Sequence, residues 1–181
     1  MTRHAFPLTR RGFLASSTVA GIGLGTAGQA SAPSFPATPE SDPFTFEITR
    51  TEEEWRALLD DESYVILRGG QTELPASSDL WTETRPGTYG CGGCNLHVYS
   101  SQWRVPLDKG GVFFAHSEPN TVLTGIDSPQ EAYGMDPNAP GNMIEVHCRR
   151  CGSHLGHILL VEGEALHCIN GRSLTFEPRD A

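Results

Sequence analysis

Cys148-Arg149-Arg150-Cys151-Gly152-Ser153-His154-Leu155-Gly156-His157 is the stretch that decides the fold of this chain. It contains one Cys-x-x-Cys pair, and a second pair, Cys91-Gly92-Gly93-Cys94, lies upstream. Two such pairs on separate turns offer four thiolates in a tetrahedron, because the two-residue spacer lets both sulfurs of a pair reach one ion about 2.3 Å away. The pattern predicts one structural Zn²⁺ with Cys91, Cys94, Cys148 and Cys151 as ligands.

Cys168 is the fifth and last cysteine of the chain. It has no cysteine left to pair with, and it follows two histidines, His154 and His157, which can stabilise a thiolate. Asn170 stands two residues further on, where an extended strand would place it on the same face as Cys168. These four residues are the candidate catalytic residues, with Cys168 as the nucleophile. The alternative is an inert buried cysteine that packs as a small hydrophobe.

Other readings of the paired cysteines are redox-active pairs or a disulfide framework. Redox-active Cys-x-x-Cys pairs belong to a thioredoxin-like βαβ pattern, which the sequence lacks. A disulfide framework suits small domains that cannot build a sufficient core, and a domain of this length does not need one. The spacing therefore favours metal binding.

Length, composition and charge narrow the class of protein. The chain has 181 residues, of which 38% are hydrophobic, and a net charge of −9. These values predict one domain with an appendage. No compact basic stretch lies outside the first residues, so we expect no nucleic-acid partner and no stable membrane association of the folded part.

The appendage is the N-terminus, where Thr9-Arg10-Arg11-Gly12-Phe13-Leu14 precedes a weakly apolar run rich in small residues. This pattern predicts a twin-arginine export signal over residues 1–32 and hence a periplasmic location. A transmembrane anchor is the rival reading, but the run is rich in glycine and poor in large apolar side chains. Cleavage after Ala30 or after Ala32 stays open. Residues 33–43 have linker composition.

The periodicity of residues 44–181 predicts a mainly β domain with antiparallel strands and one short N-terminal helix. The helix is predicted over Thr51–Leu59, with a capping box at its start and with Trp55, Leu58 and Leu59 in the core. The segment Tyr64–Arg68 fits a strand or a helical turn. A hairpin at Glu162-Gly163-Glu164 would bring His157 and Cys168 to the same open end. The predicted strands are Phe44–Ile48, Gly87–Gly90, Leu96–Tyr99, Gly110–Phe114, Thr121–Leu123, Met143–His147, His157–Val161 and Ala165–Ile169.

From about Ile48 to Phe176 the chain resembles the type B methionine sulfoxide reductases, which reduce the R epimer of methionine sulfoxide. The segments that carry the resemblance are "TEEEWRALL", "GTYGCGGC", "EVHCRRCGSHLGH" and "HCINGRSLTF". The resemblance implies two antiparallel sheets, a zinc-ribbon-like β-tent, that hold zinc away from the active site. It also implies that His154, His157 and Asn170 surround the nucleophile Cys168.

The sequence departs from the family pattern around the expected substrate pocket. Where the family has "GWPSF", whose tryptophan packs on the substrate methyl group, this chain has Gly111-Val112-Phe113-Phe114-Ala115. Phe113 and Phe114 are the candidate substrate-binding residues, although at least one of them fits a plain core strand. Leu166-His167 replaces an Arg-Tyr pair before the nucleophile, and Met143 lies near the position of an expected arginine. The resolving cysteine of many relatives is also missing.

These residues predict reduction of free or protein-bound methionine R-sulfoxide by the Cys168 thiolate. A sulfenic acid would form on Cys168 and would be reset by an external thiol, either a thioredoxin-like protein or a small thiol. Two alternatives stay open: a zinc-ribbon module that binds without turnover, and a thiol-based peroxide sensor.

Overall fold

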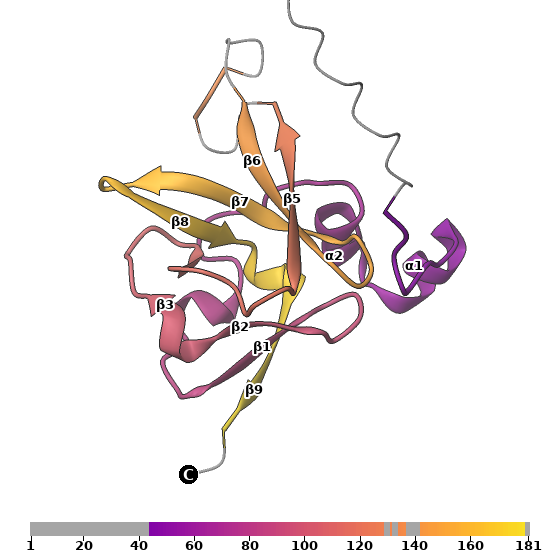
Figure 1. Ribbon diagram of the computed structural model, residues 1–181, viewed down its shortest axis with the longest axis horizontal. Helices are drawn as coiled ribbons and strands as arrows, with labels where there is room; N and C mark the ends of the chain where they lie inside the picture. The colour runs from indigo at the N-terminus through magenta and orange to yellow at the C-terminus, as the bar shows by residue number, and fades with distance from the viewer. Residues whose placement is uncertain (1–43, 129–130, 132–133, 137–141, 180–181) are drawn as a thin grey trace, which may run out of the picture. The chain divides into compact units, whose positions relative to one another are not determined.

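The computed structural model describes residues 44–128, 131, 134–136 and 142–179. The predicted signal segment 1–32 and linker 33–43 lie outside these residues. In the part of the chain that is described, the strands form two antiparallel sheets accompanied by two short α-helices (Figure 1). The predicted mainly β fold with two sheets is confirmed.

The smaller sheet has three strands in the order β2-β1-β9. These strands are β1 (Gly87–Cys91), β2 (His97–Ser100) and β9 (Leu174–Pro178). The predicted pair of strands around Cys91 and Cys94 is therefore present, with the two cysteines at the turn between β1 and β2. His97 is an exposed residue at the start of β2.

The larger sheet has six strands in the order β3-β4-β8-β7-β6-β5, and every pair is antiparallel. The hairpin of β7 and β8 lies at its centre and turns at Glu162 and Gly163, both of which have positive φ. The strand bounds are Arg104–Val105 for β3, Val112–Phe114 for β4, Val122–Asp127 for β5, Met143–Cys148 for β6, His154–Val161 for β7 and Glu164–Ile169 for β8.

Aromatic side chains from the two sheets form the centre of the core. Tyr89 of β1 and Tyr99 of β2 pack on Phe114 of β4, with ring centroids 5.0 and 4.3 Å apart. All three side chains are fully buried. Because aromatic rings bury large apolar areas, these contacts are a main link between the sheets.

The first helix, α1 (Glu52–Leu58), begins with the predicted capping box, in which Thr51 and Glu54 bond each other's backbone N–H. Trp55 is buried as expected, but Leu58 is 52% exposed. The helix has only two turns, so a single position per turn faces the core. The prediction for Leu58 was wrong.

A second helix, α2 (Asp61–Leu67), was not assigned from the sequence, which left this segment open between strand and helical turn. The side chain of Asp60 accepts a hydrogen bond from the backbone N–H of Ser63 and caps the helix. Ile66 and Leu67 are its buried residues. Short 3-10 helices with described bounds lie at Asp79–Thr82, Ser101–Trp103 and Gly171–Ser173.

Two strand predictions need correction. Residues 44–48 alternate in polarity but form no strand, and the Ile48 N–H donates to the Arg150 carbonyl, which lies in a turn. Phe46 packs there on Gly152 instead. The predicted strand at Thr121–Leu123 is the start of the longer β5, which reaches Asp127.

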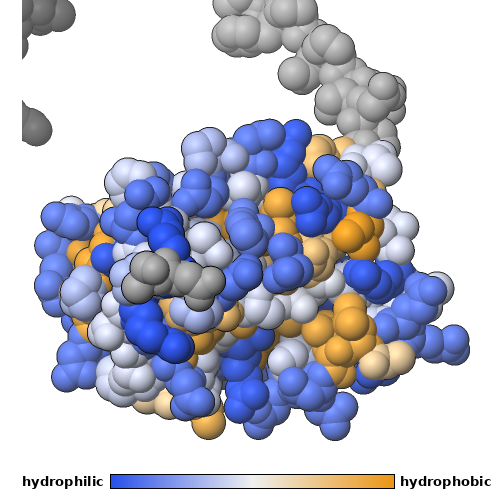
Figure 2. Space-filling model, turned by 90° about the horizontal axis from the view of Figure 1, so that it is seen from below, coloured by the Kyte–Doolittle hydropathy of each residue, from blue (hydrophilic) through white to orange (hydrophobic). Residues whose placement is uncertain are grey.

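The surface seen in Figure 2 is mostly hydrophilic, and its apolar side chains form separate patches. No helix among the described residues is long and apolar enough to span a membrane.

Candidate active site and metal centre

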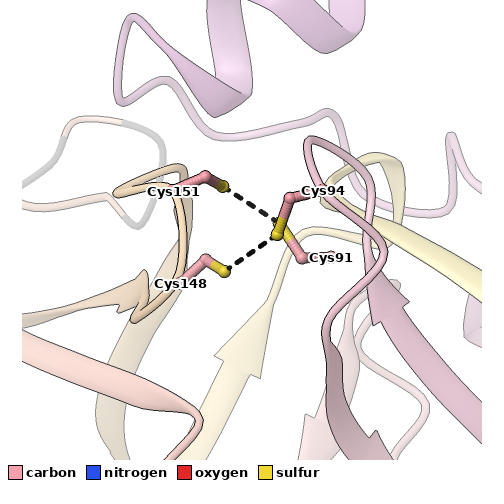
Figure 3. Close-up of side chains that lie close together, drawn as sticks. All are labelled: Cys91, Cys94, Cys148 and Cys151. Carbon is pink, nitrogen blue, oxygen red and sulfur yellow. Dashed lines mark hydrogen bonds between the residues drawn. The ribbon is translucent and has the colours of Figure 1, made fainter. Parts of the chain in front are cut away.

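The four paired cysteines come together where the turns of the two sheets meet. Cys91 and Cys94 lie on the β1–β2 turn, and Cys148 and Cys151 on the β6–β7 turn, with all four sulfurs directed at one point (Figure 3). The Sγ atoms of Cys91 and Cys151 are 3.7 Å apart, those of Cys94 and Cys148 are 3.5 Å apart, and all four lie within 4.8 Å of one another.

These distances fit a metal ion rather than disulfide bonds. A tetrahedron with zinc–sulfur bonds of about 2.3 Å has sulfur–sulfur edges of about 3.8 Å. None of the four cysteines forms a disulfide bond. Hydrogen bonds among the sulfurs raise the pKa values of Cys91 and Cys148 and lower those of Cys94 and Cys151, so the sulfurs share protons among themselves, and a cation between them would replace these protons. The geometry of the site is therefore compatible with a structural zinc ion.

The two helices support the metal centre from outside. Trp55 of α1 lies under the guanidinium of Arg68, which is 4.6 Å from the ring centroid. Arg68 also donates a hydrogen bond to the Cys151 carbonyl at 3.3 Å. A Cβ atom added at Gly93 would lie 3.3 Å from the Trp55 ring and 2.6 Å from the Ser153 Oγ, so glycine permits this packing.

Cys168 lies in the middle of a row of residues that crosses the larger sheet. It is directly opposite His157 of β7 on one side and Phe113 of β4 on the other, and His157 is in turn opposite Glu145 of β6. Directly opposite residues of an antiparallel sheet share a face. The predicted proximity of His157 and Cys168 is therefore confirmed, and Glu145 joins them on the same face.

A cavity of about 440 Å³ opens beside Cys168. Apolar side chains dominate its lining, and a few polar residues, among them Lys109, Glu73 and Asn170, stand between them. Its apolar lining includes Phe113, Met135, Leu159, Val161 and Ile169. None of the four metal-site cysteines lines this cavity. A site with an apolar wall and a single sulfur nucleophile suits a thioether-like substrate.

The two candidate substrate-binding phenylalanines lie on opposite faces of β4. Phe113 lines the cavity with Cys168, and its ring is 3.3 Å from the position of a Cβ atom on Gly111, which itself would be 3.5 Å from the Cys168 Sγ. Phe114 faces the core and stacks on Tyr99. The assignment of Phe114 to substrate binding is therefore corrected, because neighbouring strand residues alternate between faces.

His154 and His157 are both buried, and each contacts a carboxylate. The Nδ1 atom of His154 is 2.5 Å from Oε1 of Glu145, and the Nε2 atom of His157 is 3.0 Å from Oδ2 of Asp127. The second oxygen of Glu145 lies 3.1 Å from Nε2 of His147. The two rings of His154 and His157 meet edge to face with centroids 5.2 Å apart.

These contacts fix which ring nitrogen carries the proton. Although burial alone would raise it, hydrogen bonds with His147 and His154 lower the pKa of Glu145, so this carboxylate is ionised and only accepts. The Nδ1 atom of His154 therefore donates, and its Nε2 atom is buried and has no hydrogen-bond partner within the described part of the chain. Burial lowers the pKa of His157, although Asp127 acts in the opposite direction, and the ring is neutral at pH 7.

Asn170 lines the Cys168 cavity, but its amide is held by main-chain groups. Its Oδ1 atom accepts from the Glu73 N–H at 3.1 Å, and its Nδ2 atom donates to the Leu155 carbonyl at 3.2 Å. β8 ends at Ile169, so the alternation that was expected to direct Asn170 toward the histidines does not extend to it. Asn170 ties the segment at Glu73, another lining residue, to the sheet.

Sequence reasoning did not single out Glu145, Asp127 and His147. Glu145 and His147 alternate in the predicted strand that leads into Cys148, and this spacing on one face was the available signal. No sequence signal pointed to Asp127, because its partner, His157, is 30 positions away in the chain. His167 is hydrogen-bonded through Nδ1 to the buried Tyr99 hydroxyl, 2.9 Å away.

Comparison with known proteins places the chain in a family. Residues 59–178 match the model of the SelR domain. A peptide methionine sulfoxide reductase MsrB from Herminiimonas arsenicoxydans is 35% identical over 138 residues, which is 74% of this chain and 93% of that protein. This chain belongs to the type B peptide methionine sulfoxide reductases.

Relatives of this reductase occur in other kingdoms. Peptide methionine sulfoxide reductase B3 of Arabidopsis thaliana is 34% identical over 136 residues, covering 72% of this chain and 71% of the plant protein. The MsrB of Methanosarcina barkeri is 34% identical over 137 residues, covering 74% and 90%. The reductase is thus an oxidoreductase, and its Cys168 cavity is the candidate active site.

The unfolding free energy of the reductase should decrease as the pH is lowered, and it should do so over two separate pH ranges. Burial lowers the pKa values of His157 and His167 below 6.5 in the fold, so the unfolded chain binds more protons just below pH 6.5, and the unfolding free energy decreases there as the pH falls. Each histidine can lower the unfolding free energy by at most about 1.4 kcal/mol for each pH unit. Glu145, whose pKa is lowered from 4.5, adds a second loss below that value.

Urea unfolding at pH 8, 6 and 5 measures the first window, with zinc content followed in parallel because acid also protonates thiolates. His167→Gln should flatten the dependence. A midpoint that stays constant from pH 8 to pH 5 would contradict the assignment of neutral buried histidines.

Proposed function

We propose that this reductase acts on the R epimer of methionine sulfoxide and that Cys168 is its nucleophile. The observation that carries the proposal is the position of Cys168 on the wall of an apolar cavity, between Phe113 and a buried histidine in the same row of the sheet. A thiolate is a soft nucleophile that attacks sulfur, and the apolar wall accommodates the methyl and methylene groups of methionine.

In the proposed reaction the oxygen atom moves from the substrate to the enzyme. The Cys168 thiolate attacks the sulfoxide sulfur, and the oxygen takes up a proton. The oxygen then bonds to the Cys168 sulfur, while its bond to the substrate sulfur and the transient bond between the two sulfurs break. The products are methionine and a Cys168 sulfenic acid. His154 is suited to supply the proton from Nε2 when its ring is doubly protonated, because Nδ1 is held by the Glu145 carboxylate and Nε2 has no hydrogen-bond partner among the described residues.

An external thiol completes the cycle. The chain has five cysteines, and four of them form the metal centre, so Cys168 has no cysteine with which to form an intramolecular disulfide. Two thiols therefore reduce the sulfenic acid to the thiol, forming their own disulfide and water. A thioredoxin-like protein and a small thiol both satisfy this chemistry.

The direct test compares the two epimers. Zinc-loaded protein is incubated with dithiothreitol and either dabsyl-methionine R-sulfoxide or the S epimer, and product is measured by chromatography. We expect turnover of the R epimer and none of the S epimer. Turnover of the S epimer alone, or of neither, would refute the proposed activity, and the latter would favour a binding module.

We also propose that the ion held by the four cysteines is zinc. The donor set of four thiolates with tetrahedral spacing supports it, since structural zinc sites are closed and four-coordinate. The ion would stabilise the junction of the two sheets and would take no part in the chemistry at Cys168.

Phe113 and Phe114 offer a matched pair of substitutions. Phe113→Ala should lower kcat/KM for the sulfoxide by about tenfold, because an apolar contact worth roughly 1.4 kcal/mol is lost. Phe114→Ala should instead cost about 3–5 kcal/mol of stability, since it opens the core beside Tyr99. Steady-state kinetics and thermal unfolding of both variants separate the two effects. Equal kinetic effects in both would contradict the assignment of faces.

We further propose that the reductase is exported by the twin-arginine route to the periplasm. Arg10-Arg11 and the small-residue run that follows support this proposal. Replacing both arginines by lysine should leave the precursor in the cytoplasm, as measured by cell fractionation and immunoblotting. Unchanged export would refute the route.

A further inference from the structure

Met135 is an exposed methionine that shares a cavity with the candidate nucleophile. Its side chain is 42% exposed and lines the cavity beside Cys168. The chain has three methionines. Met143 in β6 is 5% exposed, and Met1 lies outside the described residues. Within the described part of the chain, Met135 is therefore the methionine that solvent-borne oxidants can reach.

The position of Met135 places a thioether where the substrate thioether would bind. The other apolar side chains of the cavity are Pro75, Phe113 and residues of the β7–β8 hairpin, so Met135 adds to an apolar wall beside Cys168. The preceding Gly134 has φ +73°, a left-handed backbone conformation that favours glycine.

We propose that Met135 is an oxidation site whose sulfoxide is reduced by Cys168 of the same chain. This inference rests on the proposed function. Hydrogen peroxide transfers one oxygen atom to the Met135 thioether and leaves water. The Cys168 thiolate then attacks the sulfoxide sulfur, and the oxygen is protonated. The oxygen bonds to the Cys168 sulfur as its bond to the Met135 sulfur and the transient bond between the two sulfurs break, which leaves Met135 and a Cys168 sulfenic acid. Two external thiols reset Cys168 as in the main cycle.

Two physical consequences follow from this arrangement. The Met135 sulfoxide is tethered close to Cys168, so its effective concentration is on the order of millimolar or higher, and its reduction does not depend on protein concentration. Together the two residues convert peroxide and thiols to water and disulfide without any external sulfoxide. Met135 would thus protect Cys168 by consuming peroxide at the entrance to its cavity.

The experiment compares wild type with Cys168→Ser. Both proteins are exposed to hydrogen peroxide with dithiothreitol present throughout, quenched, digested and analysed by mass spectrometry. Met135 sulfoxide should accumulate in Cys168→Ser and reach at most about half that level in wild type, because peroxide forms both epimers and the reductase acts on one. The ratio should be unchanged when the protein is diluted tenfold.

A Leu58→Met variant provides the matched control, because Leu58 is 52% exposed on α1 and does not line the cavity. The sulfoxide of this introduced methionine should become less protected on dilution, unlike that of Met135. Equal Met135 sulfoxide in wild type and Cys168→Ser, or none in Cys168→Ser, would overturn the inference.

The same protein samples are assayed with dabsyl-methionine R-sulfoxide. If the wild type is active in this assay but does not protect Met135, only the self-reduction is refuted. If the wild type is inactive, the proposed function itself is refuted.

Discussion

Replacing Cys168 with serine is expected to lower the rate of methionine R-sulfoxide reduction by a factor on the order of 10⁴–10⁶, the range for removal of a covalent nucleophile. A serine hydroxyl does not ionise near neutral pH and attacks sulfur poorly. The measurement is the initial rate with dabsyl-methionine R-sulfoxide and dithiothreitol, at substrate concentrations around the KM of the wild type.

Control measurements separate lost chemistry from lost structure. Cys168 is not a metal ligand and serine has nearly the same shape, so zinc content and the unfolding midpoint of Cys168→Ser should match those of the wild type. Wild type given one equivalent of sulfoxide without reductant should form a dimedone adduct at Cys168. A Cys168→Ser variant that keeps a tenth of the activity, or a disulfide between Cys168 and a metal-site cysteine, would contradict the mechanism.

Loss of the metal is the second change with a large expected effect. Structural zinc in small domains contributes about 10–16 kcal/mol at pH 7, which is as large as the whole unfolding free energy of about 5–15 kcal/mol for a typical domain. Cys148→Ser, or prolonged chelation, should therefore abolish cooperative unfolding near room temperature. Far-UV circular dichroism during heating, with elemental analysis of the same sample, makes the measurement.

The paired control is Cys168→Ser, which removes a cysteine outside the metal site. It should bind one zinc per chain and unfold cooperatively. Zinc-free Cys148→Ser that unfolds at the wild-type temperature would refute a structural metal. Wild-type protein that contains no metal but two disulfides would do so as well.

The sequence predicts only part of the row that runs across the sheet from Glu145 through His157 and Cys168 to Phe113. The hairpin signal at Gly163 and the alternation of its flanking strands placed His157 opposite Cys168 correctly. The sequence did not give the neighbours of this hairpin, because the order of strands in an antiparallel sheet depends on long-range pairing. β4 and β6 flank the hairpin, and they bring Phe113 and Glu145 into the row.

The errors have related physical causes. Phe44–Ile48 has strand periodicity, yet a strand also needs a partner, and this segment meets a turn instead. The sequence does not show which of the adjacent residues Phe113 and Phe114 faces the core. Only the packing of Phe114 on Tyr99 distinguishes them. Asp127 could not be connected to His157, since the partners of a buried imidazole are set by the three-dimensional arrangement.

By itself the sequence determined the four metal-site cysteines, the lone Cys168 and the strands that present them. Ligand spacing and strand alternation are local properties, written in residues close to one another. The tertiary structure alone decided which carboxylate holds each histidine, which phenylalanine lines the cavity beside Cys168 and that Met135 shares this cavity. Those features join segments far apart in the chain, and they arise only when the sheets pack.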